Sequence, residues 1–316
     1  MWSVRRRQHT LSEKLPSPGR HTVKTNFRRG LFFAAAGAMG GGAFVVPWKL
    51  AAENGDTQIM VLVMLVSSAL FNSLLLCRPA APSLRHTLQG WRLLLGLASC
   101  FAVLTLAGNS ATAHAISRLS APMVSVILRS DVLITAALGW LYLGERLRLR
   151  FVWGAALAGV GLWIAQSPDP GTVGDIVGVG TCLSAAVAFS IMGVMTRRYI
   201  HDLDPFALNA LRLWLSVGIW FAVNDWPTRE QFNTNVVVYA SLAAVIGPGL
   251  ARLALMISAR DLSARWTALL GLTGPMWAVL FSTLWLQQLP TSGEMCGGGL
   301  LLLGIFFALP SASTRR

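Results

Sequence analysis

The sequence predicts an all-α integral membrane protein with ten transmembrane helices, arranged as two inverted repeats of five helices. Three observations lead to this prediction. Hydrophobic residues make up 54% of the 316 residues and charged residues only 12%, whereas a soluble domain carries about 25% charged residues. The apolar runs are continuous, unlike the alternating segments of roughly 10 residues in a transmembrane β-barrel. The chain is long enough for about ten helices of some 20 residues with short links.

The first half of the chain contains five apolar runs. The first is rich in glycine and alanine, which suits close packing between membrane helices. The second is nearly uncharged, and the fifth again offers a face of small residues. The five runs are Gly30–Leu50, Thr57–Cys77, Trp91–Gly108, Ser120–Leu147 and Phe151–Gln166.

A turn at Ser167–Gly171 divides the chain near its middle, and five further runs follow it. The eighth run is broken by Gly247-Pro248-Gly249, and Gly274-Pro275 lies inside the ninth. The five runs are Asp175–Met195, Pro205–Val223, Val236–Ile257, Trp266–Leu286 and Cys296–Leu309.

The stretch Ser120–Leu147 is predicted to be one membrane-spanning helix with two opposite charges near its middle. At a rise of about 1.5 Å per residue from Ala121, Arg129 lies roughly 12 Å deep and Asp131 about 15 Å deep in a hydrocarbon layer of about 30 Å. Charges at this depth are costly and usually mark a solute or proton path. Either the two residues neutralise each other or a neighbouring helix, or they line such a path. Side chains at i and i+2 point to different helix faces, so each needs a further partner.

Five other residues are candidates for a solute cavity. Arg212 lies roughly 10 Å into the seventh run, where it either snorkels toward water or lines the cavity. Arg252 follows the break in the eighth run, and backbone groups freed at such breaks can coordinate solute or water. Trp48 and Lys49 end the first run, as an interfacial anchor or as the outer rim of a cavity. Asn109 follows the third run on the link to the fourth.

The positive charges are concentrated on one side of the predicted membrane topology. With ten spans and an internal N-terminus, 20 of the 26 Lys and Arg residues fall in the tails and the loops of one side. The opposite loops hold only Lys49, Arg118 and Arg229, together with most of the acids. This asymmetry follows the positive-inside rule and predicts that both termini are cytoplasmic. The net charge of +13 therefore reports topology, and no nucleic-acid partner is indicated.

The predicted boundaries divide the chain into four segments. Residues 1–28 are basic, poor in acids and interrupted by two prolines, as expected for a disordered cytosolic tail. An organelle transit peptide is the alternative, because such segments are also rich in Arg and poor in acids. The first repeat is expected at 29–167, the second at 168–310, and a short cytosolic tail at 311–316.

A shift of 143 residues aligns the two halves. It places Leu119-Ser120-Ala121 on Leu262-Ser263-Ala264, Gly154 on Gly297 and Gly161 on Gly304. Because each half contains an odd number of spans, the second half must insert upside down relative to the first. Inverted repeats of this kind place a solute site at their interface near the membrane midplane.

Several motifs resemble the drug/metabolite transporter superfamily, and within it the EamA-type permeases. They are the glycine-containing first span that ends at Lys49, the run Leu141–Leu147 with Gly144-Glu145-Arg146 in it, the small-residue helix Gly154–Gly161, and the segment Phe189–Arg198. The resemblance covers roughly residues 28 to 310. It implies a ten-helix bundle with a central cavity that exports small metabolites, amino acids or toxic compounds, often against protons. We expect the Gly-Glu-Arg run itself to be a structural helix end.

The chain also departs from the family pattern. Gln287, Gln288 and Leu289 stand where the second repeat would carry Gly-Glu-Arg, and Asp131 stands where many relatives have proline. Met64 replaces an arginine common in the second span. These positions bear on substrate choice, so no particular substrate is transferred from the resemblance.

The charged residues predicted inside the membrane favour a transporter of an anionic or zwitterionic solute. The predicted membrane interior contains three positive charges, Arg129, Arg212 and Arg252, and one negative charge, Asp131. No phosphate-binding Gly-rich loop is present, so a proton gradient is the expected driving force, and Asp131 is the acid deep enough to carry the proton. The four cysteines are dispersed and indicate neither a metal site nor a disulfide framework, so no cofactor is expected.

The sequence thus predicts a secondary transporter rather than an enzyme, with a small-molecule solute and membrane lipid as partners. A multi-pass protein of the bacterial inner membrane is the expected setting. Two other classes remain as alternatives, an integral-membrane enzyme acting on lipid-linked substrates and a scaffold that transports nothing. The enzyme would need paired acids or His near the membrane interface, and the sequence shows none. In the scaffold, nothing would offset the free-energy cost of burying Arg129 and Asp131.

Overall fold

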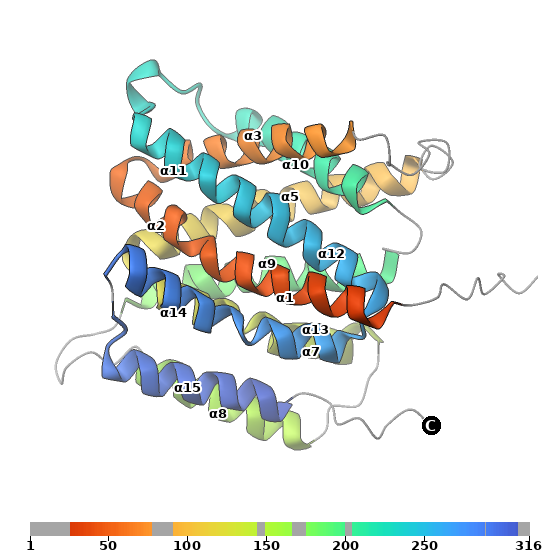
Figure 1. Ribbon diagram of the computed structural model, residues 1–316, viewed down its shortest axis with the longest axis vertical. Helices are drawn as coiled ribbons and strands as arrows, with labels where there is room; N and C mark the ends of the chain where they lie inside the picture. Colours follow the sequence, from red (N-terminus) through yellow and green to blue (C-terminus); the bar gives the residue numbers. More distant parts are fainter. Residues whose placement is uncertain are drawn as a thin grey trace, which may run out of the picture.

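The fold is helical in every part of the chain that the structure describes. The computed structural model describes residues 26–77, 91–143, 149–165, 175–199, 204–287 and 289–308, and these residues form helices and no strand (Figure 1). Four predicted features lie outside the described residues. They are the basic tail except for its last residues, the Gly144-Glu145-Arg146 helix end, the Ser167–Gly171 turn and the C-terminal tail at 311–316.

Seven helices within the described residues are long and apolar enough to cross a membrane. Two further apolar helices, Leu149–Ala165 and Ser292–Ala308, are shorter, at 17 residues each. These helices confirm the prediction of an integral, multi-pass membrane protein. The seven are Phe27–Asn54, Thr57–Leu76, Trp91–Arg118, Ile176–Tyr199, Pro205–Val223, Thr234–Asp261 and Trp266–Trp285.

Three helices of the first half, α1, α3 and α6, begin at side chains that cap them. Asn26 accepts a hydrogen bond from the backbone N–H of Arg29, Asp56 from Gln58 and Ile59, and Ser120 from Met123. The helices are α1 (Phe27–Ala43), α2 (Val45–Asn54), α3 (Thr57–Leu76), α5 (Trp91–Arg118), α6 (Ala121–Leu128), α7 (Asp131–Leu143) and α8 (Leu149–Ala165).

The helices of the second half include one irregular segment. Between α11 and α12 the chain forms a π-helix, η2, around Pro248. The elements are α9 (Ile176–Tyr199), α10 (Pro205–Val223), η1 (Arg229–Gln231), α11 (Thr234–Ala244), η2 (Val245–Ala251), α12 (Arg252–Asp261), α13 (Ala264–Gly271), α14 (Gly274–Trp285) and α15 (Ser292–Ala308).

Helix bounds in the two halves match under the shift of 143 residues. Helix α5 corresponds to the stretch from α11 through α12, α6 to α13, and α8 to α15, with both ends of each coinciding. The start of α7 likewise corresponds to the start of α14. The structural correspondence is therefore closer than the few identical residues between the halves would suggest.

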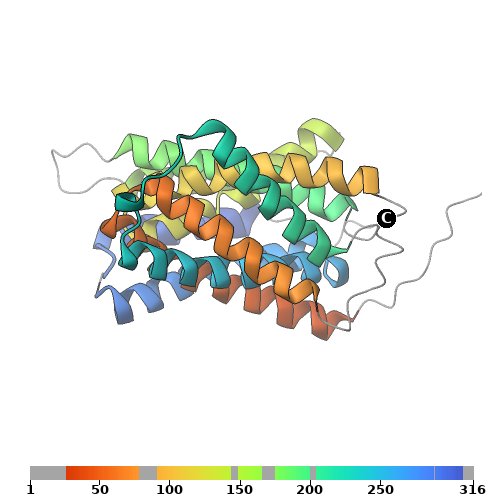
Figure 2. The same ribbon diagram turned by 90° about the horizontal axis from the view of Figure 1, so that it is seen from above.

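Helices α8 and α15 form a tightly packed pair at one edge of the molecule (Figure 1). Gly154 lies against the backbone of Gly304, and Gly161 against the backbone of Gly297. Since the residue numbers rise along one helix as they fall along the other, the two helices run in opposite directions. Helices α3 and α10 contact each other at the opposite edge of the molecule (Figure 1), which faces the viewer in Figure 2.

Ion pairs join the two halves at both ends of the bundle. At one end Arg118 of α5 pairs with Asp175 ahead of α9 at 3.2 Å. At the other, Arg29 of α1 pairs with Asp261 of α12 at 3.9 Å. The pKa of Asp175 is lowered from its ordinary value, first by the hydrogen bond from the backbone N–H of Gly178 and then by Arg118, so its carboxylate is charged at neutral pH.

Candidate functional site

The predicted fourth span is not one helix, and this changes the setting of its two charges. The chain breaks at Arg129 and Ser130, between α6 and α7. Around the break, backbone hydrogen bonds shorten to i→i−3, from Arg129 to Val126 and from Ser130 to Ile127, which tightens the turn and interrupts the α-helix. Arg129 and Asp131 therefore flank a helix break instead of lying within a continuous helix.

The ninth span breaks at the corresponding place. Helix α13 ends at Gly271, and α14 begins at Gly274 with Pro275 in its first turn. The two breaks meet, because Arg129 Nη1 donates a hydrogen bond to the carbonyl oxygen of Gly271 at 3.4 Å. An arginine at the break of one half thus contacts the backbone at the break of the other.

Arg252 joins this cluster from a third irregular segment. The predicted break in the eighth span is a π-helix that continues the helical chain, and Arg252 is the first residue of α12 after it. Arg252 lies close enough to Asp131 to be attracted by its carboxylate. The structure therefore brings Arg129, Asp131 and Arg252 to three helix irregularities from the two halves of the chain.

Several polar atoms of these three side chains are buried without a hydrogen-bond partner among the described residues. They are Arg129 Nε, Asp131 Oδ1, and Nε and Nη2 of Arg252. A buried polar atom of a charged group costs free energy unless something hydrogen-bonds to it. The cluster is therefore equipped to bind a polar molecule or ion at these atoms. We refer to Arg129, Asp131 and Arg252 as the charged cluster.

Helix α9 supplies further residues beside Asp131 that the sequence did not single out. The Ser190 hydroxyl donates to the backbone oxygen of Asp131 at 2.9 Å. Arg197, which follows the predicted sixth run Asp175–Met195, lies on the last turn of α9 and is attracted by Asp131. Gly193 lies between them on that helix, and a Cβ there would meet no atom within 4 Å. In the sequence, these three residues could have been recognised by their helical spacing, which places Ser190, Gly193 and Arg197 on one helix face.

The chain matches the family model of the EamA-like transporter family twice, over residues 28–166 and 176–309. It belongs to the EamA-like transporter family. The family is one of membrane transporters of the drug/metabolite type, so the chain is a transporter by family, with a small solute and membrane lipid as partners. The two matches assign one family unit to each half of the EamA-like chain.

Comparison with solved structures supports the fold of this EamA-like protein. One solved structure, described as "Crystal structure of protein", has a TM-score of 0.59 and 14% sequence identity. The alignment covers 86% of this chain and 96% of that one. At this identity the likeness concerns the fold alone. No curated protein matches the chain.

Arg212 of the EamA-like chain lies outside the charged cluster. It is 2% exposed, its Nε donates to Asn209 Oδ1 at 2.8 Å, and its Nη1 donates to Thr105 Oγ1 and contacts Met192 Sδ at 3.9 Å. It does not snorkel to water, because these three partners hold it between α10, α5 and α9. Arg252 is near enough to repel it electrostatically.

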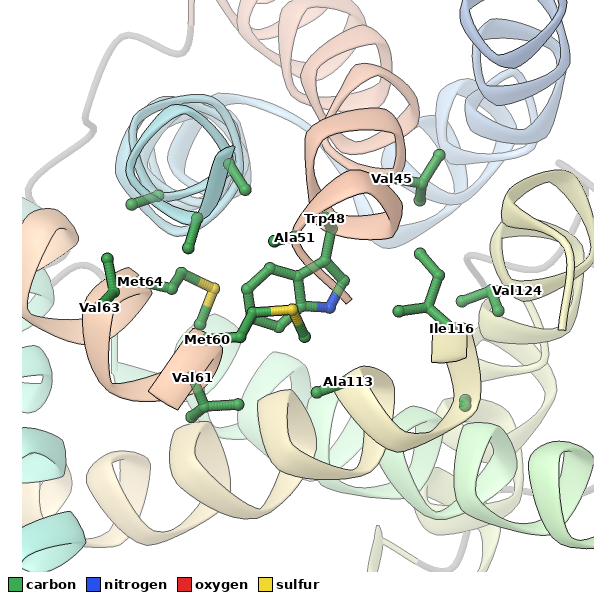
Figure 3. Close-up of a cluster of buried hydrophobic side chains, with 14 of the residues drawn as sticks. Val45, Trp48, Ala51, Met60, Val61, Val63, Met64, Ala113, Ile116 and Val124 are labelled. Atoms are coloured by element: carbon green, nitrogen blue, oxygen red, sulfur yellow. The ribbon is translucent and has the colours of Figure 1, made fainter. Parts of the chain in front are cut away.

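Trp48 and Lys49 are inside the protein rather than at its rim. The prediction of an interfacial anchor is wrong, because Trp48 is fully buried and Lys49 only 8% exposed. Helix α2 also continues to Asn54, beyond the predicted end of the span. Trp48 stacks on Phe44, and Figure 3 shows its ring beside Met60 of α3. Its Nε1 has no hydrogen-bond partner among the described residues.

Lys49 binds the end of another helix. Its Nζ donates to the carbonyl oxygens of Ile116 at 2.8 Å and Leu119 at 3.2 Å, at the C-terminus of α5. These carbonyls would otherwise lack intrahelical partners, and a cation also suits the negative end of the helix dipole. The carboxylate of Glu53 lies 3.7 Å from Nζ. In this structure Lys49 holds α5 against α2.

Asn109 lies within α5 and not on a link, since α5 extends to Arg118 instead of ending near Gly108. Its side chain donates to the backbone oxygen of Thr105 at 2.7 Å, one turn earlier.

The structure also has two apolar grooves. One, of about 210 Å³, lies against α6, α14 and α15, and the other, of about 530 Å³, lies against α3, α10 and α11. Neither groove is lined by a predicted site residue.

Proposed function

We propose that this EamA-like protein is a secondary transporter of a small solute that carries an anionic group, and that the charged cluster binds the solute. Arg129 and Arg252 would pair with the anionic group, and Asp131 with an ammonium group of a zwitterion or with a proton. Transport would follow alternating access, in which the two repeats rock around a central site.

The contact between the two helix breaks carries this proposal. Arg129 reaches the backbone at Gly271 from the opposite half, while the same side chain keeps a buried, unpartnered Nε. Helix breaks in transporters expose backbone groups where a solute can be coordinated. A site built from both halves is also the kind that a rocking motion can open to either side.

The balance of charge supports an anionic group on the solute. Two arginines of the cluster stand against one carboxylate, and the buried Arg212 adds positive charge nearby without an ion-pair partner among the described residues. A carboxylate or phosphate would compensate this excess, since bidentate pairing with guanidinium is the strong form of such contacts. A lipophilic cation would instead add to it.

The membrane topology forms part of the proposal. We infer ten spans, with α6–α7 and α13–α14 each crossing as a broken helix and α8 and α15 as short ones. The opposite directions of the equivalent helices α8 and α15 support inverted repeats. The distribution of Lys and Arg supports two cytoplasmic termini in a bacterial inner membrane, and export driven by proton exchange at Asp131 is the direction and coupling we propose.

Counterflow in liposomes tests the proposal. The purified protein is reconstituted in liposomes preloaded in turn with small carboxylates, amino acids, phosphate esters and organic cations, and uptake of the matching labelled solute is measured. We expect counterflow with members of the first three groups and its loss in Arg129→Gln and Arg252→Gln. Arg118→Gln is the matched control, because Arg118 pairs with Asp175 at the end of the bundle. Counterflow of organic cations alone, or full activity of both cluster variants, would contradict the proposal.

A further inference from the structure

The π-helix η2 sets the direction in which Arg252 leaves its helix. A π-turn holds an extra residue compared with an α-turn, and in an α-helix each residue adds about 100° of rotation. If Val245–Ala251 relaxed to a regular α-helix, Arg252 would therefore rotate by about 100° relative to α11. Such a rotation would turn the Arg252 guanidinium away from the carboxylate of Asp131.

Proline explains why this segment is not a regular α-helix. Pro248 has no N–H, so in an α-helix the carbonyl oxygen of Ala244 would lack its backbone donor. In η2 the hydrogen bonds run from i to i−5, as from the N–H of Arg252 to the oxygen of Gly247, and this pattern assigns the N–H of Gly249 to Ala244. The hydroxyl of Ser68 on α3 also donates to the carbonyl oxygen of Ala244, at 3.1 Å, and so ties the start of η2 to α3.

A side chain of α10 supplies a donor that η2 does not give to the carbonyl oxygen of Pro248. In an α-helix the N–H of Arg252 would donate to that oxygen, but in η2 it donates to Gly247. Asn209 of α10 donates through Nδ2 to the carbonyl oxygen of Pro248 at 3.2 Å and to Asn72 Oδ1 at 2.7 Å. Asn72 in turn donates to the backbone oxygen of Ser68 at 2.8 Å. The two supports of η2 are thus connected to each other through α3.

This network is buried and reaches Arg212. Ser68, Asn72 and Asn209 are at most 1% exposed. The Oδ1 atom of Asn209 accepts the hydrogen bond from Arg212 Nε, so both ends of the Asn209 amide are used. A buried polar network whose members are all partnered fixes one arrangement of the helices that it joins.

We propose that Ser68 and Asn209 are positioning residues that keep η2 in its π-helical form and thereby hold Arg252 at the charged cluster. The inference rests on the proposed function, in which Arg252 binds the solute. It adds to that function two residues from α3 and α10 that do not touch the cluster. Their effect on transport passes through Arg252.

A double-mutant cycle with Arg252 tests this inference. In counterflow assays with the solute that the wild type accepts, we expect Ser68→Ala to raise the apparent KM by roughly 3- to 10-fold, as for loss of one buried hydrogen bond. In an Arg252→Gln background, whose residual counterflow is measured at high solute concentration, Ser68→Ala should change the KM little. A general packing defect would lower transport by the same factor in both backgrounds.

Three further variants complete the test. Ser68→Thr keeps the hydroxyl and should restore the wild-type KM. Ser67→Ala is the matched control, because the Ser67 hydroxyl lies on the same helix and contacts Ser241 Oγ at 2.9 Å rather than a carbonyl of η2. Asn209→Asp keeps an acceptor for Arg212 but loses both donated hydrogen bonds, and it should raise the KM even if Ser68→Ala fails to fold.

The outcomes separate this inference from the proposed function. Impaired Arg252→Gln together with normal KM values in Ser68→Ala and Asn209→Asp would overturn the positioning role alone. Equal effects of Ser68→Ala in both backgrounds would overturn it as well. Normal counterflow by Arg252→Gln would overturn the assignment of Arg252 to the solute site, and the positioning role with it.

Discussion

Arg129 Nη1 and the carbonyl oxygen of Gly271 form a hydrogen bond of 3.4 Å between the broken helices of the two halves. Gly271 ends α13 as Leu128 ends α6, so equivalent places in the two repeats meet through one side chain. The contact is not symmetric, because Leu272 stands at the position equivalent to Arg129. One repeat therefore contributes the charge and the other contributes the backbone that receives it.

Side chains at residue 271 should disturb Arg129. A Cβ at Gly271 would lie 3.3 Å from Arg129 Nη1, which is tight but involves the flexible end of a long side chain. We expect Gly271→Ala to raise the KM for the solute by about 2- to 5-fold and Gly271→Val to raise it further, since the hydrogen bond is weakened and then lost. Counterflow in liposomes measures both.

Gly159→Ala is the control for residue 271. A Cβ at Gly159 of α8 would meet no atom within 4 Å, so this variant should transport like the wild type. If Gly271→Val kept the wild-type KM, the contact between the two breaks would have no part in solute binding.

Replacing Asp131 should separate solute exchange from proton coupling. Asp131→Asn keeps the shape of the side chain but cannot take up or release a proton at it. We expect a pH gradient to accelerate uptake by the wild type and not by Asp131→Asn, while exchange of a solute without an ammonium group continues. Proteoliposomes with an imposed pH gradient and an ionophore control measure the difference. Equal stimulation of both proteins would remove Asp131 from proton transfer.

The helical architecture was accessible from sequence because it depends on long apolar runs and on the repeat. Continuous hydropathy gave the membrane spans, and the register of 143 residues that rested on a few matches such as Gly154 with Gly297 agrees with the helix bounds. The ends of the membrane spans were harder to predict from the sequence. Helices α2 and α5 run past Lys49 and Asn109, because polar residues near helix ends find partners inside the protein.

The break beside Arg129 shows why the site itself was harder to predict. In the second half Pro275 marks the start of α14, but its counterpart in the first half is Val132, which gives no local signal. This break could have been predicted only by transferring the break at Gly274-Pro275 to the first half through the shift of 143 residues. Arg197 was missed for a related reason, since charge alone placed it in a loop while tertiary packing of α9 places it near Asp131.

Lys49 should contribute to stability more than its partner Glu53. Lys49→Met removes the hydrogen bonds to the carbonyl oxygens of Ile116, in the last turn of α5, and of Leu119, just after it, and leaves those oxygens without this donor. Loss of partners at buried polar groups costs about 1–3 kcal/mol, so the melting temperature in detergent should fall by several degrees. Intrinsic tryptophan fluorescence during heating is the measurement.

The matched variant for Lys49 is Glu53→Gln. The Glu53 side chain is 45% exposed and its oxygen lies 3.7 Å from Nζ, and exposed pairs of this kind contribute little. The melting temperature should therefore stay near that of the wild type. A larger loss in Glu53→Gln than in Lys49→Met would show that the ion pair, and not the cap on α5, is the important contact.

The pairing of α8 with α15 should depend on particular glycines rather than on glycine content. At Gly161 a Cβ would lie 2.5 Å from the backbone nitrogen of Leu301 and 2.6 Å from the backbone oxygen of Gly297. Backbone atoms cannot move aside as a side-chain end can, so Gly161→Ala must push the helices apart. Because interiors are close-packed, this should lower the melting temperature and the yield of monodisperse protein.

Neighbouring glycines on the same two helices provide the comparison. A Cβ at Gly159 of α8 or at Gly299 of α15 would meet nothing within 4 Å, and alanine has the higher intrinsic helix propensity by about 1 kcal/mol. Gly159→Ala and Gly299→Ala should therefore be neutral or slightly stabilising, while Gly161→Ala and Gly297→Ala are destabilising. Equal melting temperatures for all four variants would mean that α8 and α15 are not held together by direct backbone contact at these glycines.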